Sequence, residues 1–192
     1  NLSPYFKCSD SKHFILEQLV PTVSRLEDYL LLKFIPFGKA NVNEGAGGFE
    51  CQHGPSECRG NIVQDCTLHL MEDRAYIEMV NYVACEMSKK AGARNSSECI
   101  EEAYVSTEEV ENCLESGKGT ALQLESEFLT KLIKPKFIAT ITVNGEFNQD
   151  IQDSSQKDLM GTLCSILKDV PPCVEYYNEL ALSHILYDIM TS

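Results

Sequence analysis

Three cysteines and one histidine lie close together in the segment from Cys51 to Cys66. Thiolate and imidazole groups at short spacing either bind a metal ion such as zinc or belong to an oxidised disulfide framework. Here six residues separate Cys51 from Cys58, and seven separate Cys58 from Cys66. Structural zinc sites typically use cysteine pairs about two residues apart. The spacing favours disulfides, and we expect no metal and no other cofactor.

The whole chain is rich in cysteine, with nine in 192 residues. A chain of this length can build a core without cross-links, so this density indicates an oxidising compartment. Two N-glycosylation sequons, which begin at Asn95 and Asn1, point the same way. We expect a secretory-pathway product, secreted or lysosomal, with any signal peptide removed and no membrane span.

The charge balance excludes one class of partner. Sixteen basic and 29 acidic side chains give a net charge of -13, which repels nucleic acid phosphates. Between Glu98 and Glu127 the acidic residues are interrupted by one lysine, Lys118. A solvated helical face is the simpler interpretation of this stretch, and a surface for a basic partner is the alternative.

Hydrophobic periodicity predicts the elements that hold these cysteines. Apolar residues recur every three or four positions from Ile15 to Leu30, which predicts an amphipathic helix that Pro21 should kink. The apolar run Leu31 to Phe37, followed by Gly38, predicts a buried strand. From Arg59 to about Ile133 the pattern is helical, and we interpret this part as an insertion.

Inside the insertion, one long helix is predicted to bury a face of small and sulfur-containing residues, namely Met71, Ala75, Met79, Val83 and Met87. A soft-ligand surface is the alternative interpretation of the methionines. Ser106 and Glu109 form a capping box, and Gly117 is a plausible end for that helix.

After the insertion, the alternating residues from Phe137 to Val143 and the dipeptide Asn144-Gly145 predict a strand, a tight turn and a second strand. A helix should span about Ser155 to Lys168 and stop at Pro171-Pro172. The order strand, helix, strand, helical insert, hairpin and helix is compatible with an α/β thioredoxin-like fold, and with other α+β arrangements.

The cysteine segment resembles the signature of the gamma-interferon-inducible lysosomal thiol reductase (GILT) family, Cys-Gln-His-Gly-x2-Glu-Cys-x2-Asn-x4-Cys. Every fixed position is matched, by Cys51, Gln52, His53, Gly54, Glu57, Cys58, Asn61 and Cys66. The family also has Thr-Val-Asn-Gly, present from Thr142 to Gly145, and cysteines corresponding to Cys85, Cys99, Cys113, Cys164 and Cys173. We expect an insect member, such as a mosquito salivary one.

The resemblance covers about Leu2 to Cys173 and implies a thioredoxin-like fold, a secreted or lysosomal address and reduction of protein disulfides. It divides the chain into a core at 2–50 and 135–173 and a signature loop with helical insertion at 51–134. The tail at 174–192 lies outside the resemblance and should form an added amphipathic helix.

The same resemblance implies a reactive Cys-x-x-Cys pair where the first strand meets the first helix. This place reads Cys8-Ser9-Asp10-Ser11. Disulfide reduction needs one thiol to attack and a second to resolve the mixed disulfide. Cys8 keeps the attacking position, whereas Ser11 replaces the resolving cysteine and cannot form a disulfide.

A second departure concerns the cis-proline that thioredoxin-like proteins place beside the dithiol. Aligned on Thr142 to Gly145, that position holds Ala139. A cis bond before a residue other than proline costs about 2.5 to 4 kcal/mol, so we predict a trans peptide.

Ser11 could also be an engineered trapping substitution, but such a variant would keep the proline, so natural loss of activity is favoured.

The other eight cysteines form an even set, which fits four structural disulfides with Cys8 left over. Cys85 with Cys99, and Cys164 with Cys173, are the closest pairs in sequence.

Of the histidines, His13 fits an exposed helix residue better than a base for Cys8. His53 could either hold the shape of the loop or take part in catalysis.

Two functional hypotheses remain. The favoured one is a secreted GILT-like protein that binds another protein, which could itself contain disulfides, without reducing it. The alternative is a monothiol oxidoreductase, in which Cys8 attacks and an external thiol such as glutathione resolves the adduct.

Overall fold

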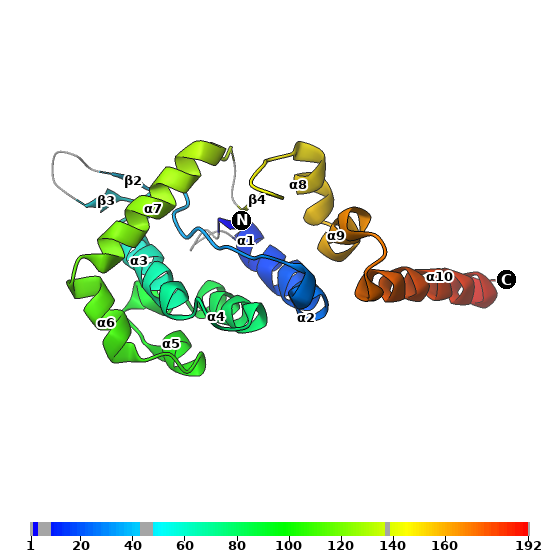
Figure 1. Ribbon diagram of the computed structural model, residues 1–192, viewed down its shortest axis with the longest axis horizontal. Coiled ribbons are helices and arrows are strands. Elements are labelled where there is room, and N and C mark those ends of the chain that lie inside the picture. The colour runs from blue at the N-terminus through cyan, green and yellow to red at the C-terminus, as the bar shows by residue number, and fades with distance from the viewer. Residues whose placement is uncertain (1, 4–8, 43–47, 137–138, 192) are drawn as a thin grey trace.

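The computed structural model describes residues 2–3, 9–42, 48–136 and 139–191, with side chains at 11–42, 48–136 and 139–183. This part of the chain is mostly helical and has two small sheets (Figure 1). The helices are α1 (Ser9–His13), α2 (Val20–Leu26), α3 (Pro55–Leu70), α4 (Tyr76–Lys89), α5 (Glu98–Glu102), α6 (Thr107–Glu115), α7 (Lys118–Ile133), α8 (Gln149–Ser155), α9 (Leu159–Leu167) and α10 (Pro171–Thr191). Among the described helices, none combines the length and apolar character that a membrane span needs.

Both sheets contain two short antiparallel strands. β1 (Leu2–Ser3) pairs with β4 (Thr140–Ile141), and β2 (Asn41–Val42) pairs with β3 (Phe49–Glu50). The first pairing joins the beginning of the chain to a segment near residue 140. It therefore brings the two strands together although the whole helical insertion lies between them in the sequence.

The predicted helix from Ile15 to Leu30 exists, but it changes its hydrogen bonding near Pro21. α1 continues into a π-helix, η1 (Phe14–Leu19), then into α2 and a 3-10 turn, η2 (Glu27–Tyr29). The Val20 N–H donates to the Ile15 carbonyl five residues back. Proline has no N–H and disrupts the regular ladder, so the π-helical turn before Pro21 is where the helix adapts.

The predicted strand from Leu31 to Phe37 is buried at its end, but it is not a regular strand. Only Phe34 has strand-like pairing, and a turn follows from Pro36. The Phe37 N–H donates to the Ile35 carbonyl, and Gly38 has a φ of 63°. Pro36 cannot donate to a ladder, so the apolar side chains are buried by a turn instead.

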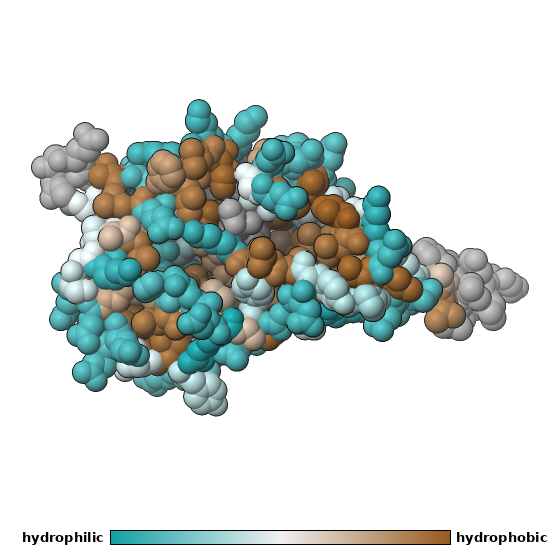
Figure 2. Space-filling view, in the orientation of Figure 1, coloured by the Kyte–Doolittle hydropathy of each residue, from teal (hydrophilic) through white to brown (hydrophobic). Residues whose placement is uncertain are grey.

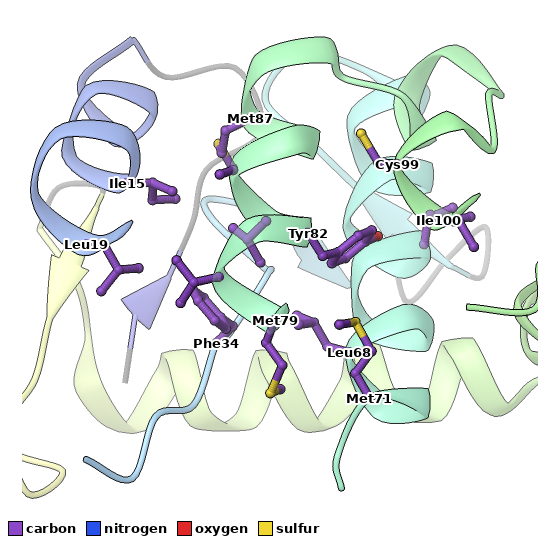
Figure 3. Close-up of a cluster of buried hydrophobic side chains, with 14 of the residues drawn as sticks. Ile15, Leu19, Phe34, Leu68, Met71, Met79, Tyr82, Met87, Cys99 and Ile100 are labelled. Carbon is purple, nitrogen blue, oxygen red and sulfur yellow. The ribbon is translucent and has the colours of Figure 1, made fainter. Parts of the chain in front are cut away.

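The single long helix predicted through Met71 and Met87 is wrong, because a turn at 71–75 separates α3 from α4. Arg74 in this turn donates to the carbonyls of Ala103 and Tyr104, both at 2.8 Å. The core assignment is confirmed for Met71, Met79, Val83 and Met87, whereas Ala75 is exposed. Figure 3 shows Met71, Met79 and Met87 among the side chains gathered between α3, α4 and the first helical segment.

The helix ends predicted in the insertion are confirmed for the Ser106 cap and for Gly117. The Ser106 hydroxyl accepts from the Glu109 N–H at 3.2 Å at the start of α6. Gly117 follows the end of α6 with a φ of 79°. α5 and a 3-10 turn, η3 (Gly92–Arg94), complete the insertion.

The turn predicted at Asn144-Gly145 is also confirmed, but the strand expected after it is reduced to one bridge residue, Glu146. Val143 and Glu146 exchange two backbone hydrogen bonds, and both central residues have positive φ. The helix predicted from Ser155 to Lys168 exists, but its predicted start is wrong. α8 ends at Ser155, and α9 begins after Asp158, whose carboxylate accepts from the Gly161 N–H at 2.8 Å.

The tail forms a helix, as predicted, but α10 begins earlier, at Pro171. Proline is tolerated in the first turn of a helix, so the Pro171-Pro172 pair starts α10 rather than ending α9. Arg25 of α2 contacts Glu179 through two hydrogen bonds of 2.9 and 3.2 Å. Beyond this contact α10 extends away from the other helices (Figure 1).

Candidate functional site

The signature begins in a loop closed by the Cys51–Cys58 disulfide. Gly54 has a φ of 89°, a conformation that favours glycine, and its N–H donates to the Cys51 carbonyl at 3.0 Å. α3 starts at the next residue, Pro55, so the loop turns directly into the helix.

Glu57 is the central hydrogen-bond acceptor of this loop. Its side chain is fully buried, and its Oε2 accepts from the His53 backbone N–H at 2.7 Å and lies 3.0 Å from His53 Nδ1. Glu57 lies in the first turn of α3, where a carboxylate also interacts favourably with the helix dipole. Of the two roles left open for His53, this geometry agrees with holding the loop shape.

The remaining signature residues attach α3 to its neighbours. Asn61 is buried, and its side-chain amide donates to the Phe37 carbonyl at 3.2 Å. Phe37 packs edge-on against Phe49, with ring centroids 6.2 Å apart. Gln52 is exposed at the loop surface. The signature thus fastens α3 to the turn that replaces the predicted strand.

Eight cysteines form four disulfides, as predicted. The pairs Cys85–Cys99 and Cys164–Cys173 are confirmed. The other two, Cys51–Cys58 and Cys66–Cys113, could not be assigned from the sequence. The three signature cysteines are therefore bonded to sulfur, and among the described residues no cluster of side chains suits a metal ion.

The segment predicted to hold the dithiol is described in part. Cys8 lies outside the described residues, as does residue 138, so the trans peptide before Ala139 stays a prediction. Ser11 in α1 is fully buried, and its hydroxyl has no hydrogen-bond partner within the described part of the chain. His13 is exposed, as expected.

Ala139 is buried, and its backbone is held by Gln152 of α8. The Gln152 amide donates to the Ala139 carbonyl at 2.9 Å, while its oxygen accepts from the Ile141 N–H at 2.8 Å. Because β1 and β4 are antiparallel, Ala139 precedes β4 on the side where the chain leaves β1 toward α1. The sequence did not predict Gln152, since the polar helix α8 lacks an apolar face.

Of the two predicted glycosylation sites, Asn95 lies in the described part of the chain. Asn95 is exposed and has a φ of 58° in the turn between α4 and α5. Such a turn leaves the amide open to a glycan. Asn1 lies outside the described residues.

Two buried acids were not predicted. Burial raises the pKa of Asp65 in α3 to about 8, and a hydrogen bond from Ser126 opposes this shift. Burial likewise raises the pKa of Glu86 in α4 to about 7, opposed by the N–H of Gly92. In the sequence, the one sign of these two acids is that each stands among the apolar residues of a predicted core helix.

Comparison with known proteins gives consistent matches. Residues 3–103 match the family described as gamma interferon inducible lysosomal thiol reductase. A Carassius auratus protein of that name is 29% identical over 171 residues, which cover 86% of this chain and 66% of the fish protein. GILT-like protein 1 of Drosophila melanogaster is 31% identical over 192 residues, which cover 89% of this chain and 76% of the fly protein.

A third relative, from Anopheles gambiae, is named gamma-interferon-inducible lysosomal thiol reductase-like protein. It is 28% identical over 179 residues, which cover 85% of this chain and 74% of the mosquito protein. The relatives include insect and fish proteins alike, so an insect origin stays a prediction.

Proposed function

Since this chain belongs to the gamma-interferon-inducible lysosomal thiol reductase (GILT) family, we propose that it keeps the family scaffold but acts by binding another protein, without normal disulfide reductase activity. The proposal rests on the chemistry of two positions, Ser11 and Ala139. The rest of the signature supports a retained scaffold.

Ser11 is the observation that carries the proposal. A reductase of this kind needs a second thiol at that position to resolve the mixed disulfide. A serine hydroxyl cannot perform this step. Ser11 is also fully buried in α1.

Ala139 supports the same conclusion. In thioredoxin-like proteins the backbone beside the cis-proline receives the substrate strand. Here the Ala139 carbonyl and the Ile141 N–H both bond to the Gln152 side chain. Gln152 therefore holds the backbone on both sides of Thr140 in place.

The proposed core is thioredoxin-like and comprises 2–50 and 135–173, with an insertion at 51–134 and a helical extension at 174–192. The antiparallel pairing of β1 with β4 supports this division, because it joins the two parts of the core. The exposed Asn95 and the four disulfides support a glycosylated protein of the secretory pathway.

The surface supports a binding role. Three apolar side chains four residues apart, Leu124, Phe128 and Leu132, are exposed along α7. Figure 2 shows apolar side chains gathered on the surface over this helix. Contiguous exposed apolar surface commonly marks protein interaction sites. Most acids between Glu98 and Glu127 are exposed as well, which fits the solvated face expected for this stretch.

A monothiol oxidoreductase is the second candidate, because all eight other cysteines are in disulfides and Cys8 is the one left over. In that reaction the Cys8 thiolate attacks a substrate disulfide and releases one substrate thiolate. Glutathione then attacks the mixed disulfide, frees the second substrate thiol and leaves a glutathione mixed disulfide on Cys8. A further glutathione regenerates Cys8 and leaves as oxidised glutathione.

Turnover of a protein disulfide substrate with glutathione separates these proposals. We expect the unaltered chain and Cys8→Ser to show the same background rate. Cys8-dependent turnover comparable to that of a dithiol family member would overturn the binding proposal. A mass-spectrometric count should find one free thiol per chain, and three or more would contradict the four-disulfide scaffold.

A further inference from the structure

A pocket of about 290 Å³ opens on the insertion, between α3, α4, α7 and the segment from Leu32 to Phe34. Half of its lining residues are apolar or aromatic, namely Leu32, Phe34, Leu68, Tyr76, Met79 and Leu122, and the other half are polar or charged. Figure 3 shows Phe34, Leu68 and Met79 approaching one another from three different elements. Ligand pockets typically measure roughly 300 to 1,000 Å³, so this one, just below that range, has room only for a small ligand.

One buried acid, Asp65 of α3, lines this pocket. Asp65 is 9% exposed. Its Oδ1 accepts from the Ser126 hydroxyl of α7 at 3.0 Å. Its Oδ2 has no hydrogen-bond partner within the described part of the chain. A buried carboxyl oxygen without a donor costs free energy, so a ligand that supplies a donor would gain affinity.

Four charged or titratable groups surround the opening, and they form two pairs. Lys33 Nζ lies 2.9 Å from Glu125 Oε1, and His69 Nδ1 lies 2.6 Å from Glu72 Oε1. All four line the pocket. Because each acid has a basic or neutral partner, the rim adds no net positive charge, and Asp65 makes the pocket as a whole acidic when ionised.

We propose that this pocket binds a small organic amine, a protonated primary ammonium group attached to an apolar body. The ammonium would donate to Asp65 Oδ2, and the apolar body would contact the walls. The rings of Phe34 and Tyr76 add favourable contact with a cation. Burial raises the pKa of Asp65 to about 8, so below that pH the bound ammonium must displace the Asp65 proton, and the adjacent cation then favours the carboxylate.

The site is separate from the Cys8–Ser11 segment in both sequence and chemistry. It uses a carboxylate and apolar walls, and no thiol. Amine binding therefore neither requires nor excludes disulfide reduction, and it can be tested independently of the proposed function.

Isothermal titration with 2-phenylethylamine tests the proposal, with 2-phenylethanol as the neutral ligand of similar shape. We expect the amine to bind with a dissociation constant below about 1 mM and the alcohol to bind at least about tenfold more weakly. Asp65→Asn should weaken amine binding at least about tenfold. Asp73→Asn, an exposed acid in the turn after α3 that does not line the pocket, is the matched control and should change nothing.

Two exposed rim residues keep the test decisive if Asp65→Asn does not fold. Lys33→Gln removes a positive charge and should tighten amine binding about twofold, whereas Glu125→Gln should weaken it about twofold. A purely structural role for these residues would not give opposite signs. No amine binding, equal binding of the alcohol, or unchanged affinity in Asp65→Asn would each overturn the proposal.

Discussion

In the signature loop, the buried Glu57 carboxylate accepts from His53 and a disulfide closes the chain around it. At the dithiol position, by contrast, the buried Ser11 hydroxyl has no partner within the described part of the chain. In the first region one carboxylate oxygen of Glu57 holds the loop, although its other oxygen, Oε1, has no hydrogen-bond partner within the described part of the chain. The second holds a buried hydroxyl for which the described residues supply no hydrogen bond. The signature therefore identifies the scaffold, and its presence alone does not establish reductase activity.

The largest effect should come from the disulfide that ties the end of the signature to α6. Cys66–Cys113 closes a loop of 47 residues, so replacing both cysteines with alanine should lower the free energy of unfolding by about 4 kcal/mol. The Cys51–Cys58 loop spans 7 residues, and the same change there should cost about 2 kcal/mol. Urea unfolding measures both, and the reverse order would contradict a structural role for Cys66.

The contact between Glu57 and His53 should have the next largest effect. Glu57→Ala removes a buried acceptor of charge-assisted hydrogen bonds, and we expect a loss of about 3 kcal/mol in unfolding free energy. His53→Ala keeps the backbone N–H that donates to Glu57, so its loss should be about 1 kcal/mol. Equal effects of the two variants in urea unfolding would show that the ring, and not the carboxylate, holds the loop.

Stability should also depend on pH through two buried acids, Asp65 of α3 and Glu86 of α4. The pKa of Asp65 is about 8 in the folded chain and near 3.8 when unfolded, so between these values the folded chain holds a proton that the unfolded chain has lost. Rising pH then favours unfolding. This contribution is complete below about pH 4 and is lost by about pH 8, with a slope of at most about 1.4 kcal/mol per pH unit.

Glu86, whose folded pKa is about 7, adds in the same direction. Melting temperatures measured from pH 5 to pH 8 should therefore fall, and Asp65→Asn should flatten the curve. A flat curve for the unaltered chain would show that neither acid is buried in its protonated form.

The smallest effect is expected at the dithiol position. Ser11→Ala removes a buried hydroxyl that lacks a described partner, so it should raise the free energy of unfolding by about 1 kcal/mol. It should leave disulfide turnover unchanged. A loss of stability would instead mean that the Ser11 hydroxyl has a role in the fold, and the contrast with the signature loop would weaken.

The elements that could be predicted depend on local chemistry. The Asn144-Gly145 hairpin, the Ser106 cap and the two disulfides that are short in sequence need only neighbouring residues. The turn between α3 and α4 depends on Arg74 reaching the carbonyls of Ala103 and Tyr104, about 30 residues away. No local pattern contains that contact.

The candidate sites show the same limit. The signature and both departures from the family pattern could be found by residue type and spacing. Asp65 could not be recognised as a buried pocket acid, because its partner Ser126 lies 61 residues away on α7. Gln152 was missed because α8 has a polar sequence and its two contacts are to backbone atoms across the hairpin.

The proposed loss of reductase activity is tested most directly by the rate of protein disulfide reduction with glutathione. Three chains are compared: the unaltered one, Ser11→Cys, and Ser11→Cys with Ala139→Pro. We predict a background rate for the unaltered chain, a small gain from Ser11→Cys and a larger gain from the double variant. An unaltered chain that reduces the substrate as fast as the double variant, and loses that activity in Cys8→Ser, would contradict the proposed loss of reductase activity.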